Sequence, residues 1–257
     1  MHLPQFPARP TCTLCDLHTS TPPNGHNGVP TTYYPASLFP TPSTPAVVFV
    51  GMNPGREESL RNEPFVGPSG QVVRTAFIPG TSLHTLSSIY FANIARCYSP
   101  ILAGKNSIAE KHYSACRPFL PLDLDETLIP GRPLHLVALG ADPLRHLCVL
   151  AGLGKKSQSW GFSHQGIPLS FSTRLSFRLW STFHPAAILR TRSLILTAEL
   201  HLNLLSSFLR GITPAPTLPE VIPCRLPHPP HPTPPSASPS TTSASSPACL
   251  PTASPKT

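Results

Sequence analysis

The sequence predicts a three-layer α/β fold, doubly wound around a central parallel sheet of four strands. Two observations carry this prediction: four short apolar runs rich in β-forming residues, and the stretches of helical pattern that separate them within residues 1–211. Strands that alternate with helices form parallel sheets, because each helix returns the chain to the same edge of the sheet. In such folds ligands bind at the carboxyl ends of the strands, so functional residues are expected there.

The four predicted strands are rich in apolar and β-forming residues, which indicates burial within the sheet. They cover residues 46–51, 87–94, 134–140 and 176–183. The first and third runs end in a glycine, Gly51 and Gly140, which indicates a tight turn at each strand end. The helices predicted around them lie at about 68–77, 107–120, 141–151 and 192–209.

The last part of the chain differs in composition from the rest. It is rich in Pro, Ser, Thr and Ala, and its charged residues are Glu220, Arg225 and Lys256. Such a segment cannot bury enough apolar surface to offset the entropy lost on ordering. We therefore predict one folded domain over residues 1–211 and a disordered tail over residues 212–257.

The folded part is basic. The chain has 19 Lys and Arg and 11 Asp and Glu, a net charge of +8. Without the two basic residues and one acidic residue of the tail, 17 and 10 remain, which gives +7 in residues 1–211. A basic surplus favours a polyanionic partner such as nucleic acid.

Other sequence features bear on where the protein works. No run approaches the roughly 18 apolar residues that a membrane span needs, and the first residues lack the apolar core of a signal peptide. We therefore expect an intracellular, cytoplasmic protein with no membrane partner. No interface pattern is visible in the sequence, so the expected state is a monomer.

Four of the seven cysteines have a spacing that suggests a metal centre. Cys12 and Cys15 form a C-x-x-C pair, Cys97 follows the second strand, and Cys116 lies in the next helix. In a reducing compartment clustered cysteines bind metal more often than they form disulfides, and four thiolates can hold a [4Fe–4S] cluster. Zinc also binds four thiolates, although zinc ribbons usually show two C-x-x-C pairs. Ordinary buried cysteines are the simpler alternative.

The remaining cysteines are not assigned to this centre. An apolar helical stretch surrounds one of them, which favours a place in the core, and the other two fall in the tail. They are Cys148, Cys224 and Cys249 respectively.

Two motifs near the first strand suggest a pocket. The turn GMNPG at 51–55 exposes backbone amides and places Asn53 where an amide side chain can orient a water, although Asn-Pro-Gly is also common turn chemistry. The segment EPFVGPSG follows at 63–70. Its Phe65 is either a stacking platform for a flat base or a core residue.

The fourth strand ends in a segment with a second set of candidates, residues 182–192. His184 lies just beyond the strand, where it is either catalytic or a capping or core histidine. Leu189 is flanked by Arg190 and Arg192, and an apolar wedge beside arginines suits a protein that enters a base stack and grips phosphates. The alternative for the two arginines is a solvated helix face.

Seven motifs occur together and in one order along the chain: C-x-x-C at 12–15, GMNPG at 51–55, EPFVGPSG at 63–70, NIARC at 93–97, ACRPFL at 115–120, VALGADPL at 137–144 and FHPAAILR at 183–190. This set strongly resembles the family 4, iron–sulphur-containing uracil-DNA glycosylases, over about residues 10–210. The resemblance implies the fold of that superfamily. It also implies a [4Fe–4S] cluster, because the four cysteines fall where the family places its ligands: Cys12, Cys15, Cys97 and Cys116.

The resemblance also implies roles for residues around a flipped-out uracil. Phe65 would stack on the base, and Asn93 would hydrogen-bond its edge. Glu58 would crowd the C5 side and so disfavour thymine. His184 would donate to O2 as negative charge builds on the leaving base.

Further roles follow from the same resemblance. The backbone amides of Gly51 and Met52 would line the O2 side of the base. Leu189 and Arg190 would help to hold the DNA open, with Arg192 beside them. No lysine is placed to form a Schiff base, so the expected enzyme is a monofunctional, hydrolytic DNA glycosylase that leaves an abasic site and acts in base excision repair.

One motif departs from the family pattern. Most family 4 members carry Gly-Glu-Ala/Gly-Pro-Gly where this chain has Gly-Met-Asn-Pro-Gly, a version similar to the single-strand-selective and mismatch-specific branches of the superfamily. In those branches the Asn orients the attacking water, which makes Asn53 the expected catalytic residue together with His184. The departure leaves open a glycosylase for another deaminated base such as hypoxanthine or xanthine, or a DNA- or uracil-binding module without catalysis. A zinc protein with unrelated chemistry is a third alternative.

Overall fold

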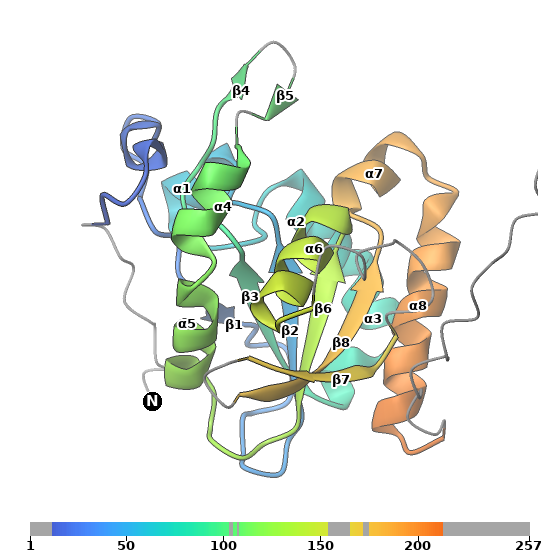
Figure 1. Cartoon of the computed structure of the whole chain (residues 1–257). Coiled ribbons are helices and arrows are strands. Elements are labelled where there is room, and N and C mark those ends of the chain that lie inside the picture. The colour runs from blue at the N-terminus through green and yellow to red at the C-terminus, as the bar shows by residue number, and fades with distance from the viewer. Residues whose placement is uncertain (1–11, 103–104, 107, 154–164, 172–174, 213–257) are drawn as a thin grey trace, which may run out of the picture. The chain divides into compact units, whose positions relative to one another are not determined.

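The computed structural model describes residues 12–102, 105–106, 108–153, 165–171 and 175–212 (Figure 1). The predicted tail lies outside the described residues apart from Ile212, as do Cys224 and Cys249 within it. The described residues all belong to one compact unit, Met1–Pro219.

A six-stranded mixed sheet forms the centre of the fold, in the order β1-β3-β2-β6-β8-β7. Its four inner strands are parallel to one another. They are β3 (Ser88–Asn93), β2 (Ala46–Gly51), β6 (Leu134–Leu139) and β8 (Ser176–Thr182). The predicted four-stranded parallel sheet is thus confirmed, with strand bounds within two residues of those expected.

Two short antiparallel strands extend this sheet at its edges, and the sequence did not predict them. They are β1 (Thr32–Tyr33), which pairs with β3, and β7 (Ile167–Ser170), which pairs with β8. An edge strand needs no continuous apolar run, because one side of it has no strand neighbour. Pro168 in β7 fits such an edge, since proline has no backbone N–H to donate to a second neighbour.

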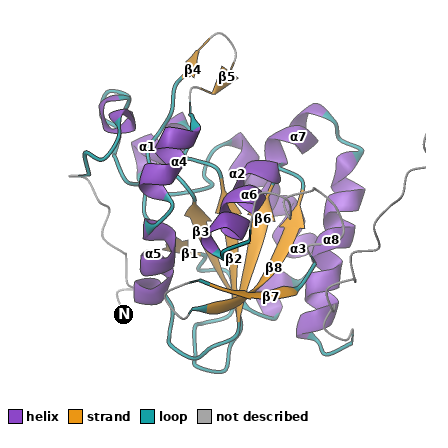
Figure 2. Cartoon of the chain, in the orientation of Figure 1, coloured by secondary structure: helices purple, strands orange, loops and turns teal. Residues whose placement is uncertain are grey.

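Helices cover both faces of the sheet, as Figure 2 shows, and give the predicted three layers. The strand side chains alternate between two cores: Val48 and Val50 point to one, Val47 and Phe49 to the other. The first core lies beneath α4 (Glu110–Cys116), α5 (Phe119–Thr127) and α6 (Ala141–Leu150). The second lies beneath α2 (Pro68–Val72), η2 (Val73–Phe77), α3 (Ile78–Gly80), α7 (Pro185–Arg190) and α8 (Leu194–Leu209).

The predicted helices differ from the structure in detail. The one expected over about 68–77 is α2 followed by a π-helical segment, η2, and the one over about 107–120 is interrupted between α4 and α5. Two six-residue helices, α1 (Arg56–Arg61) and α7, are too short to show a helical period in the sequence. The other short elements are η1 (Asp16–Thr19), η3 (Leu83–Thr85) and a two-stranded sheet of β4 (Ile101–Leu102) and β5 (Lys105–Asn106).

The parallel strands bring their carboxyl ends to one edge of the sheet. Gly51 at the end of β2 pairs with Asn93 at the end of β3, and the ends of β6 and β8 pair in the same way through Leu139 and Thr182. In Figure 1 the arrowheads of these strands point toward α2 and α7. Among the helices described, none is both long and apolar enough to span a membrane.

Candidate functional site

A cavity of about 630 Å³ opens at the carboxyl ends of the parallel strands. Its walls come from the turn after β2, the segment that leads into α2, the end of β3 with the loop beyond it, and the start of α7. The lining residues are Gly51, Met52, Asn53, Pro54, Gly55, Arg56, Glu57, Glu58, Phe65, Gly67, Pro68, Ser69, Gly70, Asn93, Tyr98, Ser99, Pro100 and His184. All seven residues expected to contact or hydrolyse the base are therefore brought to one cavity.

The turn after β2 forms the floor of this cavity. It is fastened to the neighbouring turn by two backbone hydrogen bonds, Ile94 N–H to the Gly51 carbonyl and Ala95 N–H to the Met52 carbonyl, each of 3.0 Å. Asn53 is half-buried, and its amide donates to the Pro54 carbonyl at 3.0 Å. This bond uses one of the two protons of the side-chain amide.

Two side chains meet above Gly51. A Cβ atom there would lie 2.5 Å from Oδ1 of Asn93 and 2.9 Å from Cζ of Phe65. Both contacts are closer than real Cβ atoms approach, so only glycine leaves room for the amide and the ring at this place. Asn93 is 7% exposed, which makes its amide a buried polar group that faces the cavity.

Phe65 has an unusual backbone conformation for its residue type. Its φ is 61°, in the left-handed region, which a bulky residue adopts only where the surroundings enforce it. Its ring is tilted by 31° against the ring of Phe91, with centroids 5.2 Å apart. The ring is thus backed by the core on one side and lines the cavity on the other.

Glu58, on α1, joins two walls of the cavity. Its Oε1 accepts a hydrogen bond of 2.8 Å from the backbone N–H of Gly67, the residue before α2. The carboxylate also lies beside Gly55, where a Cβ would come within 2.6 Å of Oε2. The side chain predicted to crowd one side of the base therefore also holds the loop that carries Phe65.

His184 caps α7 at its N-terminus. Its Nδ1 accepts the backbone N–H of Ala186 at 3.1 Å, which leaves Nε2 as the protonated nitrogen of the neutral ring. Burial lowers the pKa of His184, and nearby Arg190 lowers it further, while Asp142 acts in the opposite direction. The ring is therefore held neutral near pH 7, with one N–H available to donate. Gly140, with φ 98°, lies where a Cβ would be 3.0 Å from that of His184.

The three residues predicted to hold DNA lie outside the cavity. Leu189 and Arg190 end α7, Arg192 lies in the turn before α8, and all three are exposed. Leu189 is half exposed. Because α7 contacts α2, this exposed group borders the wall that carries Phe65.

The four predicted metal-binding cysteines come together elsewhere in the fold. Cys12, Cys15, Cys97 and Cys116 line one cavity of about 20 Å³. No disulfide joins them. Burial raises the pKa of Cys116 to about 12, against the effect of the Arg96 backbone N–H, which donates to its sulphur at 3.3 Å. Within the described ranges, no three His, Cys, Asp or Glu side chains form a ready-made group around a metal ion.

A clamp holds the segment with Cys15 against α4, the helix that carries Cys116. Asp16 accepts hydrogen bonds from His112 Nε2 at 2.7 Å and from Lys111 Nζ at 2.8 Å. His112 Nδ1 in turn accepts a hydrogen bond from the Ala109 backbone N–H. The proton of the neutral ring is therefore on Nε2, which donates the hydrogen bond to the Asp16 carboxylate. These bonds lower the pKa of Asp16 to about 2, with Lys111 the first cause.

Cys148, predicted as a core residue, is buried within α6, and that prediction is confirmed.

Sequence reasoning missed part of the cavity wall. Tyr98, Ser99 and Pro100 line it directly after Cys97, so the loop that begins at a predicted metal ligand also borders the predicted base site. Only their position in the sequence could have indicated a place at the cavity, because they follow the strand-end motif that contains Asn93. Their residue types alone carry no indication of a site.

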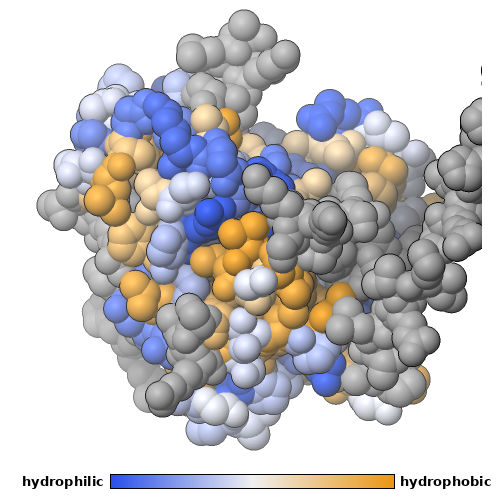
Figure 3. Space-filling view, viewed as in Figure 1, coloured by the Kyte–Doolittle hydropathy of each residue, from blue (hydrophilic) through white to orange (hydrophobic). Residues whose placement is uncertain are grey.

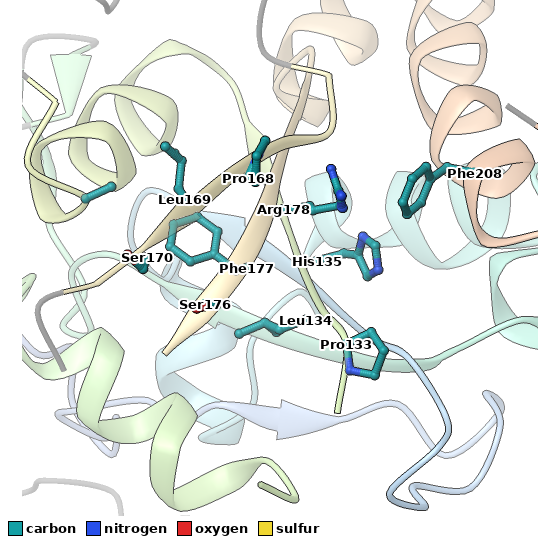
Figure 4. Close-up of a pocket in the computed structure, with 11 residues that line it drawn as sticks. Pro133, Leu134, His135, Pro168, Leu169, Ser170, Ser176, Phe177, Arg178 and Phe208 are labelled. Atoms are coloured by element: carbon teal, nitrogen blue, oxygen red, sulfur yellow. The ribbon is translucent and has the colours of Figure 1, made fainter. Parts of the chain in front are cut away.

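A larger cavity, of about 770 Å³, lies at the opposite ends of β6 and β8 (Figure 4). Two of its polar side chains are already engaged: His135 Nδ1 accepts from Trp180 Nε1 at 3.1 Å, and Arg178 donates to the Gly166 carbonyl at 2.8 Å. The guanidinium of Arg178 also lies 4.8 Å from the centroid of the Phe208 ring. Figure 3 shows a hydrophobic patch on this face, near α6 and β7. The cavity at the carboxyl ends has the richer chemistry, and we take it as the functional site.

Comparison with known proteins finds one matching family model and several distant relatives. A family model described as the uracil DNA glycosylase superfamily matches residues 39–207. A type-4 uracil-DNA glycosylase of Archaeoglobus fulgidus is 28% identical over 130 residues, which are 51% of this chain and 55% of that protein. One of Thermotoga maritima is 29% identical over 147 residues, 57% and 68% of the two chains. One of Sulfurisphaera tokodaii is 25% identical over 171 residues, 63% and 66%. The matched part thus spans only about half to two thirds of these relatives.

Proposed function

The chain belongs to the uracil DNA glycosylase superfamily, and from this we propose that it hydrolyses uracil from DNA and leaves an abasic site. The distant relatives that carry the name of type-4 uracil-DNA glycosylase support this substrate. The observation that carries the proposal is the single cavity lined by Asn53, Phe65, Asn93 and His184. These residues combine an aromatic face, an amide edge, a neutral imidazole and a second amide, which together suit a flat base and a water.

Recognition of the base rests on Phe65 and Asn93. The ring of Phe65 offers a stacking surface, and stacking on an aromatic side chain is worth about 1–3 kcal/mol per base. The Asn93 amide donates to O4 of uracil and accepts from its N3–H. Cytosine presents the inverse pattern, with an amino donor at C4 and no proton at N3, so it leaves both groups of a buried amide unpaired. Glu58 crowds the C5 side, where thymine carries a methyl group.

Departure of the base depends on charge stabilisation at O2. As the bond between C1′ and N1 breaks, its electron pair moves onto the base, and much of the negative charge lies on O2. The Nε2–H of His184 and the backbone amides of Gly51 and Met52 donate to that oxygen. One preorganised donor of this kind is worth about 3–4 kcal/mol of transition-state stabilisation. The neutral state of His184 is enough for this role, since the ring donates without giving up a proton.

Hydrolysis is completed by a water that Asn53 orients. The water oxygen bonds to C1′ of the sugar, and the proton it releases neutralises the uracil anion. The products are free uracil and an abasic sugar, and the strand itself stays intact. An amide cannot act as a strong base, so Asn53 contributes orientation while the electron-poor sugar provides the driving force.

The exposed end of α7 fits the task of holding the DNA open. Extrusion of a nucleotide from the stack costs a few kcal/mol, which an enzyme offsets with a wedge and with contacts to phosphates. Leu189 would enter the gap, and Arg190 and Arg192 would contact the backbone. The net charge of +7 in residues 1–211 favours the approach of DNA.

The four cysteines around one cavity fit a [4Fe–4S] cluster, and we propose Cys12, Cys15, Cys97 and Cys116 as its ligands. The four thiols line one small cavity, and a cluster held by four thiolates would need them to meet at one place. Such a cluster would supply covalent links between the N-terminal segment, the loop after β3 and α4. Because Tyr98 follows Cys97, these links would also steady one wall of the base cavity.

A panel of damaged oligonucleotides tests the substrate. We expect strand breaks after alkali treatment at uracil and none at cytosine or thymine, with Asn53→Ala slower by about 100-fold or more. Excision of hypoxanthine or xanthine in place of uracil would support the alternative that the unusual Met52-Asn53 pair suggests. Binding of uracil-containing DNA without any break would make the protein a binding module.

A further inference from the structure

The loop that carries Phe65 is fastened by side chains from three places. Glu58 accepts the Gly67 N–H at 2.8 Å, and Gln71 donates to the Val66 carbonyl at 3.3 Å. Arg74 makes the largest number of these contacts. Since the loop contains a residue at positive φ, its conformation depends on such external bonds.

Arg74 binds three successive residues of this loop at once. Its Nε donates to the Phe65 carbonyl at 2.9 Å, and one terminal nitrogen donates to the Pro64 carbonyl at 3.3 Å and to Glu63 Oε1 at 2.6 Å. The planar guanidinium is suited to such a set, because its donors point in fixed directions. The bond to Phe65 is made at the residue whose backbone is strained.

Arg74 also supports the ring of Phe65 through a second aromatic residue. Its guanidinium carbon lies 4.7 Å from the centroid of Phe91, and Phe91 packs against the ring of Phe65 at 5.2 Å. The side chain of Arg74 is 18% exposed, so these contacts are largely shielded from water. One side chain thus constrains both the backbone of Phe65 and the aromatic residue beneath its ring.

The helix that carries Arg74 is itself irregular. Arg74 lies in η2, the π-helical segment between α2 and α3. A π-helical turn is rare and occurs frequently at functional sites. On the preceding turn, Gly70 lies so close to the loop that a Cβ would come within 2.0 Å of the Phe65 carbonyl oxygen. The absence of a side chain at Gly70 brings the helix near enough for Arg74 to reach that same oxygen.

We propose that Arg74 is a positioning residue that fixes the left-handed conformation of Phe65 and thereby the orientation of the stacking surface for the extruded base. The role in base binding rests on the proposed function, whereas the control of the Phe65 conformation does not. Arg74 itself does not line the cavity, so it acts through Phe65 and Phe91 and not on the substrate.

The first test needs no substrate. 4-Fluorophenylalanine is placed at position 65 alone, and its ¹⁹F spectrum is recorded in the full chain. We expect one narrow signal in the parent protein and a broadened or split signal in Arg74→Gln and Arg74→Lys, because neither replacement provides all three bonds. Arg210→Gln, which removes an exposed charge at the end of α8, serves as the matched control.

The second test measures binding and turnover. The affinity is determined for a single-stranded oligonucleotide with one 2′-fluoro-2′-deoxyuridine, which binds without cleavage. We expect Arg74→Gln to weaken binding by about 5- to 150-fold, the range that base stacking spans. On a cleavable uracil substrate, KM should rise more than kcat falls. Millimolar guanidinium should partly restore affinity to Arg74→Ala, while sodium at equal ionic strength should not.

These measurements separate two kinds of failure. A spectrum and an affinity in folded Arg74→Gln equal to those of Arg210→Gln would overturn the inference. The same oligonucleotide with thymidine in place of the uridine analogue serves as the reference. If the parent protein binds the uridine analogue no better than this reference, the proposed function fails. The ¹⁹F spectra then still decide whether Arg74 controls Phe65.

Discussion

Gly70 and Phe65 show how one residue without a side chain determines the shape of the site. The backbone of α2 approaches the loop before it more closely than any Cβ permits, since the Phe65 carbonyl oxygen would be 2.0 Å from a methyl group at position 70. The contact is to backbone, which cannot rotate away as a flexible side chain can. The requirement for glycine at this position is therefore one of space, and it does not involve a positive φ.

Gly70→Ala is expected to lower the free energy of unfolding by about 3 kcal/mol or more, because overpacking against backbone forces the helix and the loop apart. Urea denaturation of the two proteins measures this difference. Gly80→Ala is the matched control. Its Cβ would meet only Glu199 Oε1 at 3.4 Å, so the change should stay within about 1 kcal/mol. Equal losses in the two variants would contradict the close approach at Gly70.

At the scale of elements, the sequence was most informative about the parallel strands. The runs that became β2, β3 and β6 are buried throughout and contain few polar residues to obscure them. The edge strand β1 is two residues long and carries no such signal. The π-helical segment η2, within the helix expected over 68–77, was also not predicted.

The residues of the candidate site that lie nearest to the strand ends were the easiest to predict from the sequence. Gly51, Asn93 and His184 follow directly from the rule that ligands bind at those ends. Phe65 does not, because it reaches the cavity through a loop whose left-handed residue has no signature in the sequence. Its assignment came from the family resemblance. Tyr98 was missed for the same physical reason, since its loop takes its course from tertiary contacts.

At the scale of the whole molecule, two buried histidines link stability to pH. Burial, reinforced by Arg178, lowers the pKa of His135 to about 4. Burial, reinforced by Arg145, lowers that of His146 to about 4 as well. The ordinary pKa of 6.5 applies in the unfolded chain. Between about pH 4 and pH 6.5 the unfolded state binds more protons than the folded state, so acidification favours unfolding.

We therefore expect the free energy of unfolding to fall between pH 7 and pH 5. Each of the two histidines lowers the free energy of unfolding by about 2 kcal/mol at pH 5, because this pH lies about 1.5 units below the pKa of a histidine in the unfolded chain. Burial also lowers the pKa of His184 and of His201, which act in the same direction. Urea denaturation at several pH values measures the slope. His135→Gln keeps an acceptor for Trp180 but cannot bind a proton, so its slope should be shallower; an unchanged slope would contradict the assignment to His135.

The measurement that tests the central claim most directly is the release of free uracil from a single-stranded oligonucleotide with one uracil. The parent protein and His184→Ala are compared by mass spectrometry, after their iron content and thermal unfolding have been matched. The account predicts free uracil and abasic strand in equal amounts from the parent protein, and a rate about 100- to 1,000-fold lower in His184→Ala, as expected for the loss of one preorganised donor. An intact oligonucleotide after incubation with folded, iron-loaded parent protein would contradict it, as would an equal rate in His184→Ala.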